Sequence, residues 1–566
     1  MTSVRMRLGQ AVRALAPRVR ELRFAGGLLV LLGTLLPWAT RVFERGPYPD
    51  KSTLQFFTAP FALTGFRWHL FLIAIATLAL AIWTLPGRNR MLSALGWSTI
   101  AIAGVNIAYL FSEGGLGGLA IGAPVTLLGG IAIVLAAHAA SGEPVPVWDW
   151  RLPWWAEWLL LLVIFAGLLF LVASLLTAGG IGVTSPFSGA IFLSFLGAAG
   201  GLLGVLHGAG LLGWITAMSE RHRVFSVLVL LFVALALPLT SAGTEYWMTV
   251  ASNIGIYAAT AIGLNIVVGL AGLLDLGYVA FLGIGSFVAA NLSGAAAAKF
   301  GIDLPFPVVV VICAVVAGVF GAIVGSPTLR VRGDYLAIVT LAFGEIFVRS
   351  SQNNIAGLTG GPNAIPNIPA VEAFGTNFSS AVEIGGIKLP GGVLYYILIV
   401  LLVAGVMLVF ANLKSSRLGR AWIAIREDED AARAMGIRTG SAKILAFMIG
   451  AILAGIAGAF FAHKTATVSY ESFRFLESIT LLAAVILGGM GTIPGALLGA
   501  SLLFVLPEKL REFADYRLLI FGLALIVIMR FRPQGLVPDR HRRAELAPED
   551  EPPSLAATPP PEKVPT

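Results

Sequence analysis

Long apolar runs recur along most of the chain, and they constrain its fold more than any other feature. Most are long enough for an α-helix to cross a hydrocarbon core of about 30 Å. Because 57% of the 566 residues are hydrophobic and only 12% are charged, the sequence predicts an all-α polytopic membrane protein. The runs lie at about 24–38, 68–86, 93–111, 119–140, 155–178, 188–214, 224–240, 247–269, 277–297, 305–325, 335–350, 391–411 and 441–462.

The positions of the charged residues indicate the orientation of the spans in the membrane rather than a catalytic or nucleic-acid-binding site. The net charge of +8 comes from 38 Lys and Arg against 30 Asp and Glu, and the excess lies mostly at the ends of the apolar runs. Lys and Arg at such positions mark the cytoplasmic side, so we expect the lipid bilayer, and no nucleic acid, as a partner. Cys313 is the only cysteine and the six histidines are scattered. This pattern excludes a disulfide within the chain and argues against a metal site.

The chain divides into three parts by the character of its spans. Residues 1–220 hold about six spans and no motif that carries chemistry, so we interpret them as an accessory transmembrane block. Residues 224–538 differ because Gly, Asn and acidic residues interrupt their spans. Residues 544–566 are rich in Pro, Glu and Ala, which predicts a disordered tail. Basic stretches before residue 24 and after residue 529 predict that both termini are cytoplasmic.

The apolar stretch 476–506 is too long for one simple span, because its roughly 31 residues would rise about 46 Å as a helix. Its centre is the helix-breaking sequence GGMGTIPG at 488–495, which favours two half-helices that meet at a break. A membrane tolerates such a break only where protein or a water-filled cavity covers the backbone. With a returning segment here, a last span at about 516–530 runs inward and leaves the basic tail in the cytoplasm.

One charged segment, 411–438, interrupts the apolar pattern with six basic residues and an acidic run. The pattern predicts a short helix over Ala421–Met435 that ends at Gly436. Such an exposed helix between two spans suits docking into a groove on a cytoplasmic partner. A solvated loop that merely follows the charge rule is the alternative. The residues expected near one face of the helix are Ile425, Ala432 and Met435.

Two further features concern helix packing and the outer surface. Span 441–462 carries small residues on adjacent stripes, which predicts that neighbouring helices approach it closely. The polar loop Ser351–Gly392 contains LTGGPNAIPNIP at 358–369. Its Gly and Pro content predicts a rigid, turn-rich external segment suited to capture of a substrate or a donor protein. The two stripes are Ala451, Gly455 and Ala459, and Ala454, Gly458 and Ala462.

Residues 263–290, GLNIVVGLAGLLDLGYVAFLGIGSFVAA, resemble the signature of the permeases of branched-chain amino acid ABC importers, in particular the LivM-type subunit. The resemblance is collinear over about 224–538. Ala364 departs from it, because that family often has Gly in the GGP-x-G-I pattern, and the ordinary permease lacks the block 1–220. Further matching motifs are LRVRGDYLAIVTLAFGEIF (329–347), TGGPNAIPNIP (359–369), SRLGRAWIAIREDEDAARAMGI (416–437), ILAGIAGAFFA (452–462), ESITLLAAVILGGMGTIPGALLGA (477–500) and FRPQGLVP (531–538).

The resemblance implies a subunit of an ATP-driven importer that moves branched-chain amino acids across the inner membrane by alternating access. It implies a LivH-type second permease, two ATP-binding cassette subunits and an extracytoplasmic substrate-binding protein as partners. This chain lacks G-x-x-x-x-G-K-[ST], so ATP and Mg²⁺ are expected on the ATPases, with no cofactor and no enzymatic activity here. The residues expected in ATPase coupling are Gly419, Arg420, Arg426, Glu427, Ala431, Ala432 and Gly436.

The candidate residues of the translocation pathway are polar groups and glycines in interrupted spans. Polar groups at membrane depth are costly and suggest a pathway, although hydrogen bonds between helices explain them equally well. Broken helices near 269–277 and 488–495 offer amides to a substrate carboxylate; alternatively, they only shape helix packing, and the binding protein sets specificity. The candidates are Asn265, Asp275, Glu345, Gly488, Gly489 and Gly491.

Other functions remain open at this point. An importer of the same build that carries urea, short amides or another amino acid class has the same sequence features. A membrane-embedded enzyme needs a cluster of titratable groups, and the sequence shows no such cluster. A secondary transporter driven by an ion gradient needs no segment that docks an ATPase, so the charged segment argues against it.

Overall fold

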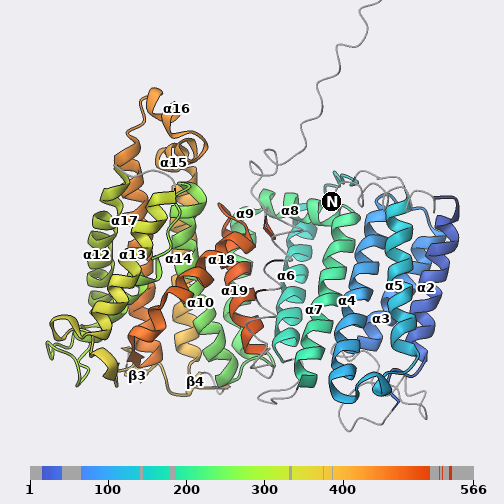
Figure 1. The fold of residues 1–566 in the computed structure, drawn as a ribbon, viewed down its shortest axis with the longest axis horizontal. Coiled ribbons are helices and arrows are strands. Elements are labelled where there is room, and N and C mark those ends of the chain that lie inside the picture. Colours follow the sequence, from blue (N-terminus) through green and yellow to red (C-terminus); the bar gives the residue numbers. More distant parts are fainter. Residues whose placement is uncertain are drawn as a thin grey trace, which may run out of the picture. The chain divides into compact units, whose positions relative to one another are not determined.

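The computed structural model describes residues 16–40, 66–140, 145–177, 186–329, 334–373, 375–384, 387–509 and 535–537, together with residues 522 and 526. The chain is predominantly helical (Figure 1). Eight of the described helices are long and apolar enough to cross a membrane, or up to nine if a bent pair is one span. The predicted all-α polytopic fold is therefore confirmed. The predicted tail 544–566 and nearly all of the predicted span at 516–530 lie outside the described residues.

Contacts divide the chain into two compact units. The first unit comprises Met1–Met248 and Pro507–Arg517, and the second comprises Thr249–Leu506 and Leu518–Thr566. The seven predicted runs of the first unit, from 24–38 to 224–240, are present as helices, with ends that differ by a few residues. Its elements are η1 Ala16–Arg18, α2 Val19–Leu35, α3 Phe66–Ile82, α4 Arg88–Gly114, η2 Leu116–Gly118, α5 Gly122–Ala139, α6 Trp154–Thr177, α7 Pro186–Gly208, α8 Leu211–Arg221, α9 Arg223–Ala236 and η3 Leu237–Leu239.

Small residues bring the helices of the first unit close together. A Cβ at Gly129 of α5 would lie 3.0 Å from the carbonyl oxygen of Gly26 in α2. A Cβ at Gly204 of α7 would lie 2.5 Å from the Cβ of Ala94 in α4. Close packing of this kind drives helix association in lipid, where the hydrophobic effect between helices is absent. The first unit is thus a helical bundle with its own packed core.

The second unit consists of long helices joined by turns and short strands. Each predicted span from 247–269 to 441–462 is present as a helix, and the stretch 476–506 is divided into two helices as predicted. The helices are α10 Glu245–Asn265, continued by the π-helical turn η4 Ile266–Leu270, α11 Val279–Leu292, α12 Phe306–Gly325, η5 Ser326–Leu329, α13 Asp334–Gln352, α14 Val393–Ser415, α15 Arg417–Glu427, α16 Glu429–Ala434, α17 Thr439–Thr465, η8 Tyr470–Phe473, α18 Phe475–Gly488 and α19 Ile493–Lys509.

Helix α17 packs against α11 and α12 along the predicted small-residue stripes. A Cβ at Gly455 would lie 2.4 Å from the Cβ of Ala317 in α12. A Cβ at Gly458 would lie 2.3 Å from the carbonyl oxygen of Leu282 in α11. Neither glycine can be enlarged without movement of the neighbouring helix, which confirms the prediction of close approach on this span.

Turns and short antiparallel strands shape the polar loop between α13 and α14, as its Gly and Pro content predicts. The strand β1 pairs with β6, which directly follows α17, so the loop is joined to the end of that helix. The loop elements are η6 Ile355–Gly357, η7 Gly361–Asn363 and the pairs β1 Ile365–Pro366 with β6 Thr467–Val468, β2 Glu372–Ala373 with β3 Thr376–Asn377, and β4 Val382–Ile384 with β5 Ile387–Leu389.

Ala364 keeps the backbone geometry of a glycine. Its φ is +58° and its ψ is −174°, a region that is essentially restricted to glycine. We therefore expect Ala364→Gly to stabilise the protein by about 1 kcal/mol, because relief of the strained backbone outweighs the greater freedom of glycine in the unfolded chain. Thermal unfolding of the purified protein measures this effect as a higher midpoint temperature.

The control for this prediction is Asn367→Gly. Asn367 has φ +57°, but asparagine tolerates the left-handed region better than alanine does. The stabilisation should therefore be smaller at residue 367. An unchanged or lower midpoint for Ala364→Gly would show that the alanine is not strained.

Candidate functional site

The charged segment 411–438 forms two short helices, where the sequence predicts one over Ala421–Met435. The helices α15 and α16 are separated at Asp428 (Figure 1), whose φ of −155° and ψ of 110° are extended. The Asp428 carboxylate accepts hydrogen bonds from the N–H groups of Asp430 and Ala431, at 2.9 Å each. The single-helix prediction is wrong because this aspartate caps a new helix rather than continuing the first.

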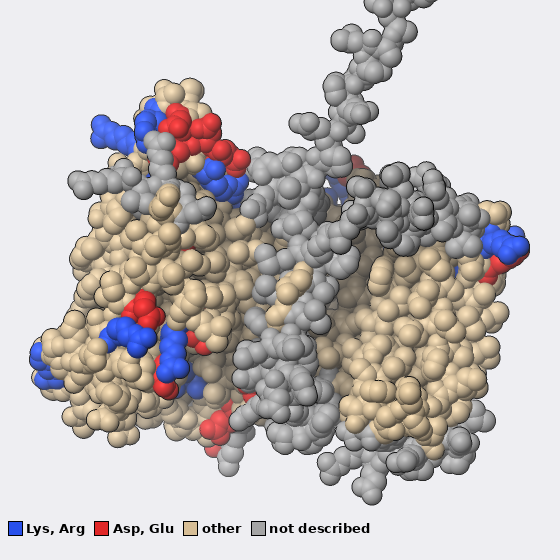
Figure 2. All heavy atoms as spheres, viewed as in Figure 1, with Lys and Arg blue, Asp and Glu red and all other residues tan. Residues whose placement is uncertain are grey.

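One face of these two helices is buried against the rest of the unit. Trp422 is fully buried and donates from Nε1 to the carbonyl oxygen of Ala442 in α17, at 2.7 Å. Ile425 and Ala432, two of the three residues expected near one face, are buried against their own unit, whereas Met435 is 84% exposed. The expected grouping of the three residues on one face is therefore wrong for Met435, because α16 ends at the preceding residue. Figure 2 shows acidic and basic side chains gathered over the end of the unit that carries α15 and α16.

The residues expected in ATPase coupling fall into two groups by exposure. Gly419 and Ala432 are buried and Arg426 is half-buried, so these residues contact their own chain. A Cβ at Gly419 would lie 2.1 Å from the carbonyl oxygen of Leu413, which explains the need for glycine at this position. The residues left exposed to a partner are Arg420, Glu427, Ala431 and Gly436.

Arg426 joins the charged segment to the first helix break, 269–277. Its Nη1 donates to the carbonyl oxygen of Gly269, at 2.8 Å. This carbonyl lies at the C-terminal end of η4, where a helix has unpaired oxygens and partial negative charge. Gly272 has φ +70°, and a Cβ there would lie 2.5 Å from Arg426 Cγ. The backbone therefore approaches the arginine as closely as it does because residue 272 is glycine.

Lys414 joins the charged segment to the second helix break, 488–495. Its Nζ donates to the carbonyl oxygen of Gly491, at 2.8 Å. Gly489 and Gly491 have φ of +125° and +78°, which favours glycine at both positions. Sequence analysis did not identify Lys414 as a site residue, because a lysine at the end of an apolar run is explained by topology alone.

Asn265, the last residue of α10, connects the helix that leads into the first break with the second break. This residue is fully buried; its Nδ2 donates to the carbonyl oxygen of Thr492 at 2.9 Å, and its Oδ1 accepts from the N–H of Gly491 at 2.8 Å. The N–H of Gly489 donates to the carbonyl oxygen of Val485, at 3.0 Å. The amides of both glycines are therefore engaged within the chain in this conformation.

Residues 535–537, part of the motif FRPQGLVP, contact the second break, which the sequence did not predict. The N–H groups of Leu536 and Val537 donate to the carbonyl oxygens of Leu487 and Gly488, at 2.8 Å each. Thr492 Oγ1 donates to the carbonyl oxygen of Val537, at 3.0 Å. The last carbonyls of α18 thus find partners although that helix ends inside the apolar stretch.

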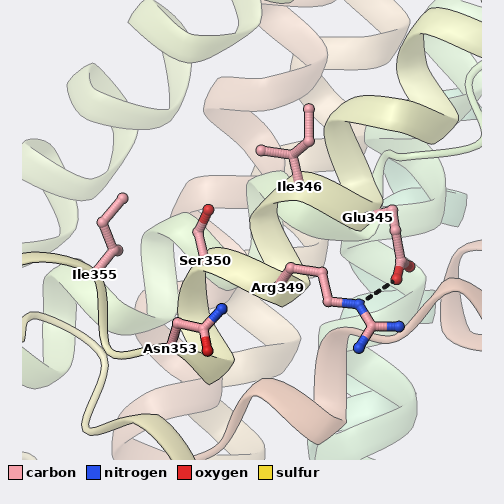
Figure 3. Close-up of a pocket in the computed structure, with 6 residues that line it drawn as sticks. All are labelled: Glu345, Ile346, Arg349, Ser350, Asn353 and Ile355. Atoms are coloured by element: carbon pink, nitrogen blue, oxygen red, sulfur yellow. Dashed lines mark hydrogen bonds and ion pairs between the residues drawn. The ribbon is translucent and has the colours of Figure 1, made fainter.

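The remaining two pathway candidates have different surroundings. Asp275 is buried, and its Oδ1 accepts from the N–H of Gly277 at 2.9 Å, which closes the turn before α11. Glu345 is exposed on α13 and pairs with Arg349 at 2.9 Å between Oε1 and Nε (Figure 3). The structure therefore brings Asn265 and the second break together with Lys414, whereas Glu345 belongs to a separate exposed face.

Among the described residues, no group of three or more His, Cys, Asp and Glu is placed to hold a metal ion. Interrupted membrane helices that are hydrogen-bonded to a charged segment are typical of transport proteins rather than of membrane anchors. Residues 244–529 match the family described as branched-chain amino acid transport system / permease component. The chain belongs to this family, and it is a multi-pass membrane permease.

Relatives of known name support the same assignment. The chain is 41% identical over 337 residues to the high-affinity branched-chain amino acid transport system permease protein LivM of Escherichia coli K12, which covers 57% of this chain and 77% of LivM. It is 30% identical to BraD of Pseudomonas aeruginosa, over 50% of this chain and 91% of BraD. It is 27% identical to LivH of Escherichia coli K12, again over 50% and 91%. No solved structure matches the chain.

Replacement of Asn265 by leucine should destabilise the second unit. Asn265→Leu keeps a similar volume but leaves the Gly491 N–H and the Thr492 carbonyl without their partner. Each unsatisfied buried group costs about 1–3 kcal/mol, so we expect a clear fall in the midpoint of thermal unfolding.

Asn412→Leu is the matched control, because Asn412 is exposed near the end of α14. A surface substitution of this kind usually changes stability by less than about 0.5 kcal/mol. Equal midpoints for the two variants would show that Asn265 does not hold the breaks together.

Proposed function

We propose that this chain is the permease subunit of an ATP-driven importer of branched-chain amino acids. Its partners in this proposal are a LivH-type permease, two ATP-binding cassette subunits and an extracytoplasmic substrate-binding protein. The names of the relatives support the substrate class. The presence of both LivM and LivH among these relatives supports a second permease of related sequence.

The observation that carries the proposal is the pair of hydrogen bonds from the charged segment to the two helix breaks. Arg426 holds the carbonyl of Gly269, and Lys414 holds the carbonyl of Gly491. Arg426 lies in α15 and Lys414 in the last turn of α14, so movement of this segment acts on both interrupted helices through these two contacts. Interrupted helices are the elements that form substrate sites and move in alternating access.

The same segment is built to receive a partner. Trp422, Ile425 and Ala432 fix it to the unit, while Arg420 and Glu427 remain exposed. The Lys443 ammonium in α17 lies 2.5 Å from the Glu429 carboxylate, which holds α16 on α17. A rigid exposed helix with charged ends suits a groove on an ATPase.

ATP hydrolysis belongs on the partner subunits in this proposal. The sequence contains no G-x-x-x-x-G-K-[ST] loop, which is the element that cradles nucleotide phosphates. The chain is therefore assigned a transport role without enzymatic activity of its own. The density of Lys and Arg in the charged segment supports a cytoplasmic location for it, with cytoplasmic termini and the inner membrane as the site of the protein.

The assignment predicts leucine uptake that depends on Glu427. Cells that hold this chain and its partners should take up radiolabelled leucine. Glu427→Lys should reduce uptake at least tenfold, or about 1.4 kcal/mol, because it reverses an exposed charge and removes the 2.6 Å ion pair with Arg426. Asp149→Lys is the control, because Asp149 is exposed in the first unit and the charge change is the same. If the cells take up urea or a short amide instead of leucine, the proposed importer architecture stands and the proposed substrate class is wrong.

The transmission step predicts a separate loss for Lys414→Met. This variant removes the hydrogen bond to Gly491 and leaves the exposed docking residues unchanged. We expect uptake to fall about tenfold or more, since a hydrogen bond from a charged group contributes about 1.5–3 kcal/mol, while the ATPases still co-purify with the permease.

Lys299→Met serves as the control for Lys414→Met. Lys299 Nζ donates to the carbonyl oxygen of Ala356, at 2.6 Å, so this variant also removes a lysine–carbonyl contact. Normal uptake with Lys414→Met would exclude this contact from transport. Loss of ATPase binding would show that the residue supports docking instead.

A further inference from the structure

One face of α13 is exposed in this chain, although the opposite face is packed. A Cβ at Gly277 would lie 1.9 Å from the carbonyl oxygen of Thr340, and one at Gly283 would lie 2.5 Å from Phe347 Cε1. The exposed residues recur at helical spacing and so form a single stripe. We call them the α13 stripe; they are Tyr335, Ile338, Ala342, Glu345, Ile346 and Arg349.

Helix α13 crosses the same layer as the membrane span α17. Just before α13, a Cβ at Gly325 would lie 3.1 Å from the Cβ of Phe447, in the first part of α17. After α13, strand β1 pairs with β6, directly beyond the other end of α17. Helix α17 covers 27 residues and is long and apolar enough to cross a membrane. The α13 stripe therefore lies at membrane depth.

An exposed ion pair joins the interior of this helix, at Glu345, to its last turn, at Arg349. Glu345 is about 16 Å from the start of α13 and about 10 Å from its end, at 1.5 Å of rise per residue. The side chains of Glu345 and Arg349 are 48% and 68% exposed. Figure 3 shows them beside a hollow whose lining also includes Ile346, Ser350 and Asn353. Ionised side chains at this depth face protein or a water-filled cavity rather than lipid.

Helix α12 provides the contrast within the same unit. Its exposed residues, among them Val311, Val315 and Val319, are all apolar, as expected for a surface that faces lipid tails. The charges of the α13 stripe have no counterpart there. The two helices therefore face different surroundings.

We propose that the α13 stripe is the surface that this chain presents to a LivH-type permease, with the Glu345–Arg349 pair in a water-filled space between the two chains. This inference rests on the proposed function. The LivH of Escherichia coli is similar to this chain over 91% of the LivH sequence, so a partner of that type has a helix that corresponds to α13. In a near-two-fold arrangement of two related chains, corresponding helices meet where they lie beside the axis, and we place α13 there.

Single-cysteine labelling tests the proposal in membranes that contain the whole transporter. Cys313 is the only cysteine of the chain and is buried, so Cys313→Ala provides the background, whose leucine uptake is measured in parallel. Ala342→Cys and Ile346→Cys probe the α13 stripe, and Val315→Cys probes α12. A membrane-impermeant methanethiosulfonate reacts with the thiolate, which forms in water and not in lipid. We expect the stripe cysteines to react at least tenfold faster than the control.

Oxidative cross-linking then identifies what covers the stripe. With a cysteine at the aligned position of the partner permease, Ile346→Cys should give a heterodimer, and Val315→Cys should not. Reaction no faster than at Val315 would overturn the proposal, since the stripe would then face lipid. Cross-linking between two copies of this chain would also overturn it. A reactive, cross-linked stripe without leucine uptake supports the surface and counts against the transport assignment.

Discussion

In the hydrocarbon core, each backbone N–H and carbonyl must find its partner within the protein. The rest of this structure depends on how that requirement is met at two places where helices stop. At the first break, Arg426 accounts for the carbonyl of Gly269. At the second break, Asn265, Lys414 and the returning residues 535–537 account for the freed groups. Each interruption is therefore stabilised by a specific contact from a distant part of the sequence.

The residues of the charged segment therefore have two different roles, which its sequence pattern of basic and acidic residues does not distinguish. Its exposed residues are available to a partner, whereas Arg426 and Lys414 face inward and hold backbone carbonyls. A charged hydrogen bond in a region of low dielectric constant is strong and directional. Arg426 in α15 and Lys414 at the end of α14 therefore tie this segment to the two breaks. The charged segment is thus hydrogen-bonded to both interrupted helices while part of it remains exposed.

The exposed faces of two helices in the second unit also differ in polarity. Helix α12 exposes aliphatic and aromatic residues, and α13 exposes an ion pair at comparable depth. Because charges at that depth need water or protein, the exposed faces distinguish lipid from a partner chain. The helices of the first unit pack through glycines such as Gly129 and Gly204, which lie against neighbouring helices.

Sequence by itself determined the helices, the break at 488–495, the small-residue stripes of α17 and the family, because these follow from local periodicity, helix-breaking residues and contiguous motifs. It did not determine the division of the charged segment at Asp428, the exposure of Met435, or the contacts of Lys414 and Arg426. Those contacts join residues 77 and 157 positions apart, and no local pattern encodes which carbonyl a cation will reach. Only the packing of the helices decided that these two side chains meet the two breaks, while Glu345 faces outward.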